Sequence, residues 1–75
     1  MNLHEVAAEI LEVPVSEIND ETSPKNTKNW DSLKHINLVL AIEANFGVKF
    51  ATSEIMLINS LASAKALLGE KGVAA

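Results

Sequence analysis

The stretch DSLKHINLVLAIEANFG, residues 31–47, decides what kind of fold this chain adopts. Asp31 suits the N-cap of a helix, because its carboxylate can accept hydrogen bonds from the first free backbone N–H groups. Gly47 is a typical helix terminator, since glycine adopts the left-handed conformation without strain. No proline or glycine lies between them. The segment therefore predicts a helix from Ser32 to about Phe46.

The apolar side chains of this segment form two stripes on a helical wheel. The first stripe comprises Leu38, Val39, Ile42 and Phe46, and the second comprises Leu33, Ile36, Leu40 and Ala44. A domain of this size cannot easily surround a helix that is apolar on nearly all sides. We expect the first stripe to face the core and the second to be exposed as a partner-binding surface. The alternative is that both stripes are core and contact different neighbouring helices.

A second helix is expected from about Leu3 to Val13, because apolar residues recur at helical spacing from Leu3 to Leu11. Asn2 and Glu5 match a capping box at its start, and Pro14 is expected to end it. The residues that follow, 15–31, are mostly turn and cap formers, so they predict a long loop. Val15 and Ile18 are the residues of this loop expected to pin it to the core.

Two further helices are predicted after Phe50. The short third helix begins at Thr52 or Ser53, and the fourth begins at Asn59 or Ser60 and ends at Gly69–Gly72. The predicted fold class is therefore all-α. We expect a small four-helix bundle of three longer helices and one short one, with a long loop between the first two.

Length and composition limit the classes of function that the chain can have. The 75 residues fit a single domain over 1–75, with 73–75 as a frayed tail, and leave little material for a walled catalytic cleft. A net charge of −4 argues against nucleic acid as a partner. The absence of cysteine excludes disulfides and thiolate metal sites and fits the cytoplasm. No apolar run reaches the length of a membrane span, and we expect a cytoplasmic monomer.

Ser32 is the side chain whose chemistry needs an explanation. A serine nucleophile needs a base and an oxyanion hole; His35 lies three residues on, but no Gly-x-Ser-x-Gly elbow surrounds Ser32. An ordinary first-turn serine beside a capping Asp31 is the plainest alternative. A third interpretation is a covalent attachment point, because a helix N-terminus favours a phosphate and the long polar loop gives a modifying enzyme access.

The whole chain resembles the acyl carrier proteins. The residues that carry the resemblance are Asn29-Trp30-Asp31-Ser32-Leu33, Ile36, Leu38-Val39, Ile42-Glu43, Phe46-Gly47-Val48 and Phe50. The resemblance implies that Ser32 receives 4′-phosphopantetheine from coenzyme A through a phosphopantetheinyl transferase. The thiol of this arm would hold an acyl chain as a thioester. The protein would then carry that chain between acyl-loading and acyl-using enzymes and would not itself be an enzyme.

The same resemblance assigns roles to other residues. Asp31 and Leu33 would be recognised together with Ser32. Partner enzymes would contact the exposed stripe and an acidic side chain, here Leu33, Ile36, Leu40 and Glu43. The acyl chain would enter an aliphatic interior, for which the candidates are Val39, Ile42, Ile55, Ile58 and Leu61, with ordinary core packing as the alternative for each.

The chain departs from the family pattern in two places. Many members have glycine two residues before the aspartate, whereas this chain has Asn29 there, followed by Trp30, which we expect to pack the loop end onto the bundle. Glu43 is the only acid of the second helix after Asp31. Because surface charge governs partner choice, we expect a carrier of a specialised fatty-acid, polyketide-like or modified-acyl pathway. A peptidyl carrier and an unmodified interaction module are the alternatives. His35 is expected to be partly buried and hydrogen-bonded, or to line the entry of the arm.

Overall fold

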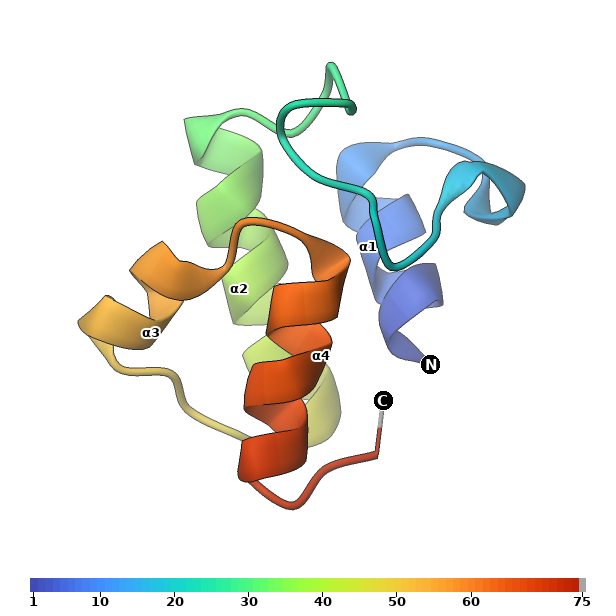
Figure 1. Cartoon of the computed structure of the whole chain (residues 1–75). Coiled ribbons are helices and arrows are strands. Elements are labelled where there is room, and N and C mark those ends of the chain that lie inside the picture. Colours follow the sequence, from blue (N-terminus) through green and yellow to red (C-terminus); the bar gives the residue numbers. More distant parts are fainter. Residues whose placement is uncertain (75) are drawn as a thin grey trace.

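A computed structural model describes residues 1–74 of the chain; Ala75 lies outside the described residues. The elements are α1 (Leu3–Leu11), a 3₁₀ helix η1 (Val15–Glu17), α2 (Ser32–Phe46), α3 (Thr52–Leu57) and α4 (Leu61–Glu70). Residues 1–74 contain no strand. Figure 1 shows the three longer helices α1, α2 and α4, with the short α3 on the side of the bundle away from α1. The predicted all-α bundle is confirmed.

Helix α1 begins as predicted but ends earlier. The backbone N–H of Glu5 donates a hydrogen bond to Asn2 Oδ1 at 2.8 Å, and the backbone N–H of Asn2 donates to Glu5 Oε1 at 3.0 Å. These two bonds form the expected capping box. The helix ends at Leu11 because Glu12 adopts a left-handed conformation, with φ of 60°. The expectation that Pro14 ends the helix was wrong, since the chain leaves the helix two residues before the proline. A non-glycine residue in this conformation is strained.

Both predicted ends of α2 are confirmed. Asp31 Oδ1 accepts the amide of Lys34 at 2.9 Å, and Gly47 closes the helix with φ of 66°. The two apolar stripes have different environments. Leu38, Val39 and Ile42 of the first are buried, whereas Leu33, Ile36, Leu40 and Ala44 of the second are exposed. The alternative in which both stripes are core is therefore excluded.

The long loop is held at two points of the fold. The backbone N–H of Ala62 donates to the Asp20 carbonyl at 2.8 Å, and that of Leu61 donates to the Thr22 carbonyl at 2.9 Å. These bonds join the loop to the start of α4. Ile18 is buried as expected. Val15 is 51% exposed, so the prediction that it pins the loop was wrong; it belongs to η1, a surface turn with no buried residue.

The start of α3 differs from the prediction. Thr52 and Ser53 lie inside α3 and do not cap it. The N-cap is Ala51, whose amide donates to Glu54 Oε1 at 2.8 Å, so a glutamate supplies the cap that we expected from a hydroxyl. Ser60 caps α4 as predicted, by accepting the amide of Ser63 at 3.2 Å.

The end of α4 also differs from the prediction. Gly69 lies within α4, and the chain turns at Gly72, whose φ is 80°. Glycine at the interior position weakens a helix but does not stop it. Of the tail expected to fray, Val73 packs against the core and donates its amide to Leu68 O at 2.9 Å.

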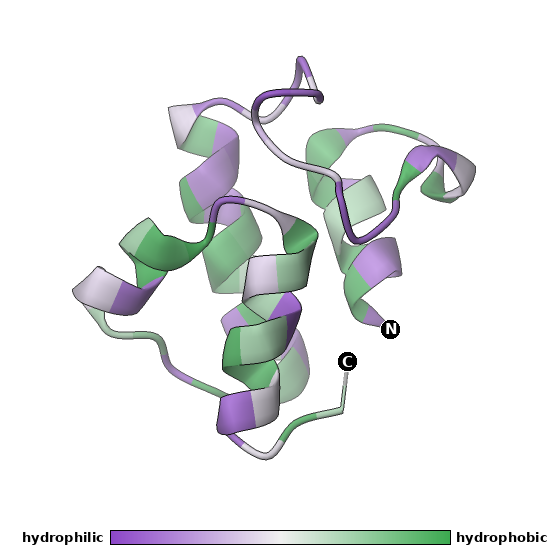
Figure 2. Cartoon of the chain, in the orientation of Figure 1, coloured by the Kyte–Doolittle hydropathy of each residue, from purple (hydrophilic) through white to green (hydrophobic). Residues whose placement is uncertain are grey.

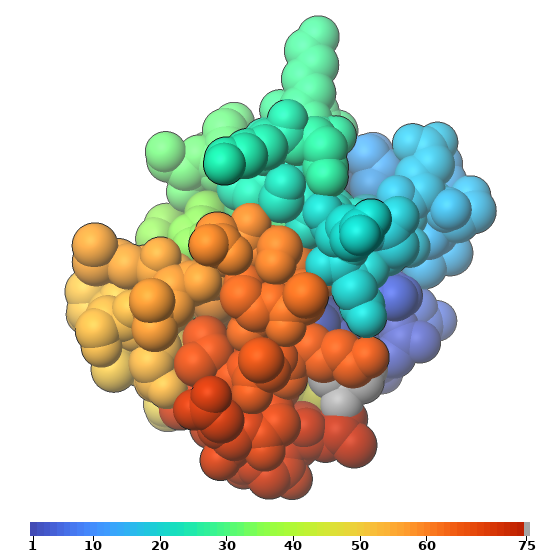
Figure 3. Space-filling view, in the orientation of Figure 1, coloured from blue at the N-terminus to red at the C-terminus, as the bar shows by residue number. Residues whose placement is uncertain are grey.

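The core comes mainly from the three longer helices, and Ile18, Trp30, Phe50 and Ile58 of the connecting segments complete it. Its largest fully buried side chains are Leu3, Val6, Leu11, Leu38, Ile42, Leu61 and Leu68. Helix α3 contributes no buried residue, although Figure 2 shows strongly hydrophobic residues in its second half. Figure 3 shows α3 at the edge of the molecule, next to the first turns of α2. The fold therefore leaves a short helix with an apolar second half exposed beside the start of α2.

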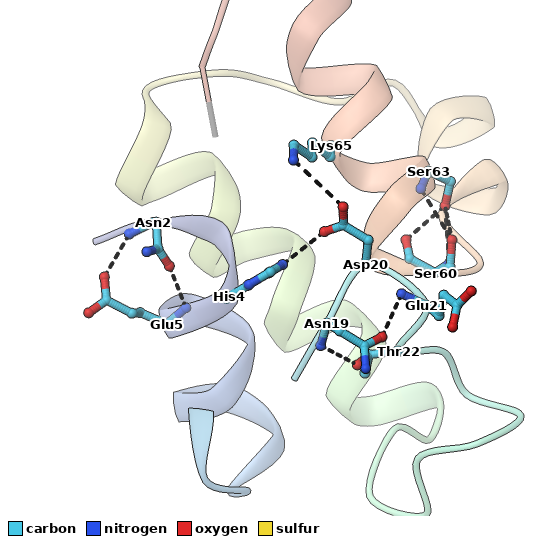
Figure 4. Close-up of polar contacts among 10 residues, drawn as sticks. All are labelled: Asn2, His4, Glu5, Asn19, Asp20, Glu21, Thr22, Ser60, Ser63 and Lys65. Atoms are coloured by element: carbon cyan, nitrogen blue, oxygen red, sulfur yellow. Dashed lines mark hydrogen bonds and ion pairs between the residues drawn. The ribbon is translucent and has the colours of Figure 1, made fainter. Parts of the chain in front are cut away.

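An ion-pair cluster ties α1, the loop and α4 together (Figure 4). Asp20 Oδ1 lies 2.8 Å from His4 Nε2, and Asp20 Oδ2 lies 3.6 Å from Lys65 Nζ. A carboxylate only accepts hydrogen bonds, so His4 Nε2 carries the proton. The hydrogen bond from His4 and then the charge of Lys65 lower the pKa of Asp20 from its ordinary value of 3.8.

This cluster predicts a loss of stability in acid. A carboxyl group with a lowered pKa in the folded state stabilises the fold above its ordinary pKa, and this contribution is lost as the pH falls below 3.8 through the folded value. Asp20→Asn is therefore expected to unfold at a lower denaturant concentration than the parent at about pH 7, and the difference is expected to shrink as the pH falls below 3.8. Glu21→Gln, at the exposed neighbouring position, is the control. A difference that persists unchanged in acid would contradict the assignment.

Candidate functional site

Ser32 is the first residue of α2 and is exposed. It follows Asp31, whose carboxylate is directed at the amide of Lys34. The first N–H groups of a helix have no partner within the helix, so the serine hydroxyl lies beside free donors and the positive end of the helix dipole. The position combines access from solvent with an environment that favours a negatively charged group.

The two residues before this aspartate anchor the loop end. The side-chain amide of Asn29 donates to the carbonyl of Leu11 at 2.9 Å, which satisfies a carbonyl at the C-terminal end of α1. Trp30 is only 3% exposed, and its indole Nε1–H donates to His35 Nδ1 at 3.0 Å. The prediction that Trp30 packs the loop end onto the bundle is confirmed. Together these contacts position the segment that carries Ser32.

His35 uses both of its ring nitrogens within the protein. Its Nδ1 accepts from Trp30, and its Nε2 lies 3.0 Å from the carbonyl oxygen of Ile55. Because an indole only donates and a carbonyl only accepts, the ring is the neutral tautomer with the proton on Nε2. Neither nitrogen is left to take a proton from Ser32. The catalytic interpretation of Ser32 and His35 therefore has no base in this arrangement.

A groove of about 660 Å³ opens beside Ser32 between α2 and α3. Its lining is mainly apolar and comprises Pro24, Trp30, Asp31, Ser32, His35, Ile36, Thr52, Ile55, Met56, Ile58 and Asn59. The volume is in the range of sites that bind small molecules. Ile55 and Ile58 were predicted from the sequence to line the pocket, whereas Met56, Asn59 and Thr52 were not. The apolar run Ile55-Met56-Leu57 in the second half of α3 was the feature that could have indicated Met56.

The other three acyl-pocket candidates lie elsewhere. Val39, Ile42 and Leu61 are 2%, 0% and 0% exposed and belong to the core cluster. None of them lines the groove. For these three residues the structure shows the core packing that we gave as the alternative. The apolar pattern alone did not distinguish groove from core, because both need aliphatic side chains.

The exposed stripe on α2 continues onto α3. Leu33, Ile36 and Leu40 are 69%, 49% and 57% exposed, and Met56 and Leu57 of α3 are exposed as well. Single exposed leucines are common, but five large apolar side chains on two adjacent helices form an unusual surface. The contribution of α3 to this exposed apolar surface was not predicted from the sequence.

Glu43 is placed differently from our expectation. It is only partly exposed, and its Oε2 accepts the amide of Phe50 at 2.8 Å. The carboxylate therefore fastens the segment after α2 to the helix. One of its oxygens is thus hydrogen-bonded within the chain, and its role as an acidic contact for partners stays a prediction.

No helix in the described part of the chain is long and apolar enough to cross a membrane. Within residues 1–74 no group of three or more His, Cys, Asp or Glu side chains is arranged to hold a metal ion.

Comparisons with known proteins agree with this geometry. Residues 2–68 match the family model described as "Phosphopantetheine attachment site". The chain is 30% identical over 69 residues to the "Polyketide-8 synthase acyl carrier protein 2" of Streptomyces avermitilis, covering 92% of this chain and 79% of that protein. It superposes with a TM-score of 0.81 on the solution structure of holo acyl carrier protein from Geobacter metallireducens, at 26% identity over 92% of this chain and 79% of that one. The chain thus belongs to the acyl carrier proteins, which hold 4′-phosphopantetheine as their cofactor and carry acyl groups without catalysing their conversion.

Proposed function

We propose that Ser32 is the attachment site of 4′-phosphopantetheine and that the chain delivers acyl groups within a polyketide-like or other specialised acyl pathway. The observation that carries the proposal is an exposed hydroxyl at the start of α2 that opens onto an apolar groove. The bound group supplies a thiol that holds cargo as a thioester. Intact mass measurement after incubation with coenzyme A, magnesium and a phosphopantetheinyl transferase tests the attachment. One phosphopantetheine per chain is expected.

The residues at the start of α2 fit a phosphate ester. Ser32 Oγ would attack the phosphorus of coenzyme A that carries the pantetheine group, and the pyrophosphate bond would break with adenosine 3′,5′-bisphosphate as the leaving group. The Oγ proton would go to a base of the transferase, since His35 is engaged on both nitrogens. The free N–H groups of the first turn favour the phosphate charge that results. Asp31 and Leu33 flank the serine and are both exposed, so a transferase can contact them together with it.

The groove supports an uncharged acyl cargo over an aminoacyl one. Its lining contains a single carboxylate, that of Asp31, which already caps α2. The ammonium group of an aminoacyl cargo would lose water on entering without gaining another counter-charge. A methylene chain would instead bury apolar area against Ile36, Ile55 and Ile58.

The pathway is supported by surface charge and by one relative. The curated relative acts in polyketide synthesis by its name. Helix α2 has only Glu43 as an acid within Ser32–Phe46, and its carboxylate bonds the Phe50 amide. Apolar contacts rather than acidic ones therefore dominate the surface that α2 offers to partners, which favours enzymes with an apolar docking face.

We further propose that the stripe Leu33, Ile36 and Leu40 docks partner enzymes. Ile36→Glu and Leu40→Glu are each expected to leave the fold intact, because both side chains are about half exposed. Each is expected to raise the KM of a partner enzyme for the loaded carrier about tenfold, the effect of losing one well-packed interface side chain. Steady-state kinetics at varied carrier concentration measures this.

The matched control for this prediction is Asn37→Glu, which adds the same charge at an exposed position of the same helix. It is expected to change KM much less. Equal effects of all three substitutions would indicate general charge repulsion. Unchanged turnover in Ile36→Glu and Leu40→Glu, with both proteins folded, would refute the docking stripe.

A further inference from the structure

Trp30, His35 and the carbonyl of Ile55 form a continuous hydrogen-bond relay beside Ser32. The Trp30 Nε1–H donates to His35 Nδ1 at 3.0 Å, and the His35 Nε2–H donates to the Ile55 carbonyl oxygen at 3.0 Å. The two rings lie nearly parallel, at 24°, with centroids 6.0 Å apart. Trp30 belongs to the loop end, His35 to α2 and Ile55 to α3. The relay therefore joins α3 to the segment that presents the serine.

Helix α3 has few other attachments. It is six residues long and none of its residues is buried. A helix this short is not stable without tertiary contacts. Its other polar tie is the ion pair of Glu54 with Lys71 at 3.1 Å, and both of these side chains are about one quarter exposed. Its apolar anchors are Ile58, the buried C-cap residue, and Ile55, which is partly buried against the core. One hydrogen bond from His35 is thus a substantial part of what holds α3 in place.

The relay has a single compatible protonation state. The indole can only donate and the carbonyl can only accept, so the imidazole between them must be neutral with its proton on Nε2. No other orientation of the ring satisfies both neighbours. Loss of the bond from Trp30 or of the bond to Ile55 leaves a partly buried polar group without its partner, which makes the two hydrogen bonds dependent on each other.

We propose that Trp30 and His35 are positioning residues that couple the docking of α3 to the conformation of the serine-bearing loop end. The groove beside Ser32 is bounded by α3 on one side, so a displacement of α3 away from α2 would widen the groove and break the bond between His35 and Ile55. Acyl chains too bulky for the closed groove are the cargo class that this coupling controls. That statement about cargo rests on the proposed attachment at Ser32, whereas the coupling itself does not.

Hydrogen exchange measured by NMR on the unmodified full chain tests the coupling. The chain contains one tryptophan, so a single indole N–H resonance reports on the first bond. The amides of Ile55 and Ile58, which bond to the carbonyls of Ala51 and Ile55, report on α3. His35→Ala is expected to speed exchange at all three N–H groups roughly fivefold, the factor that one net hydrogen bond supplies. Amides of α1 are expected to keep their parent rates.

Two further variants separate the relay from general destabilisation. Trp30→Phe keeps an aromatic ring but removes the indole donor, and it is expected to speed exchange at Ile55 and Ile58 although it changes no group in α3. His35→Asn retains an acceptor near the position of Nδ1 and is expected to restore protection of the indole but not of α3. Parent-like rates in α3 for both His35→Ala and Trp30→Phe, or equal acceleration in α1 and α3, would overturn the proposal.

The same experiment keeps this inference separate from the attachment site. It uses the unmodified protein, so its result does not depend on whether Ser32 accepts phosphopantetheine. If His35→Ala does not fold, Trp30→Phe alone decides the outcome. A protein that shows the coupling but is not modified at Ser32 would refute the proposed attachment and leave the relay standing.

Discussion

Ser32→Ala is expected to abolish the gain of phosphopantetheine completely. The substitution removes Oγ, the atom to which the phosphate would be bonded, so no slower route to the same ester remains at this position. Incubation of parent and variant with coenzyme A, magnesium and a broad-specificity phosphopantetheinyl transferase, followed by intact mass spectrometry, measures the effect. The parent is expected to gain one group per chain and the variant none.

The control for this result is Ser53→Ala. Ser53 is also an exposed serine in the first turn of a helix, in this case α3. The Ser53→Ala variant is expected to gain phosphopantetheine like the parent. This result would show that the attachment depends on the position of the serine in the fold and not only on a serine in the first turn of a helix. Modification of Ser32→Ala would place the attachment elsewhere. Circular dichroism of each variant establishes that it is folded before its mass is interpreted.

Leu38→Ala is expected to cost most of the stability of the domain. Leu38 is fully buried on α2, and a buried Leu→Ala change costs about 3 kcal/mol through lost apolar burial and the cavity left behind. A domain of this size has only about 3–5 kcal/mol in total. The variant is therefore expected to keep only about 0–2 kcal/mol, which places it between the unfolding midpoint and a marginally stable fold in water. Urea unfolding followed by circular dichroism and by the fluorescence of Trp30 measures the loss.

Leu40→Ala is the matched control, because it makes the same chemical change two residues away on the same helix. Leu40 is 57% exposed, and exposed substitutions change stability by about 0.5 kcal/mol or less. The ratio of the stability losses caused by Leu38→Ala and Leu40→Ala measures how differently the two stripes of α2 are buried. Similar losses for both leucines would mean that the second stripe is buried in solution, and would remove the basis for a docking surface.

The features that the sequence alone predicted correctly are those decided within a few residues. Asp31 reaches the amide of Lys34, and Asn2 exchanges hydrogen bonds with Glu5, across three residues each. The two stripes of α2 follow from the helical period and from which residues are apolar. The motif around Ser32 identified the family for the same reason, because its residues are adjacent in the chain.

The errors fell where local alternatives were close in energy. Thr52 and Ser53 are good caps, yet α3 starts at Ala51, because Glu54 reaches back to the Ala51 amide. Gly69 resembled a terminator but remained in α4, where the cost of glycine is only about 1 kcal/mol. Pro14 resembled the end of α1, but Glu12 turned the chain first.

Only the tertiary structure decided which long-range contacts hold the loop and the segment that carries the serine. The contacts of Asn29 with Leu11, of His35 with Ile55 and of His4 with Asp20 join residues 16 to 20 positions apart. They exist because packing of the aliphatic core brings separate elements together, and no spacing in the sequence encodes that arrangement. The amino-acid pattern thus determined the helices, their apolar faces and the position of the serine. The packing of those helices determined which apolar residues became core and which became groove, and it left α3 on the surface beside the serine, where the hydrogen bond from His35 helps to hold it.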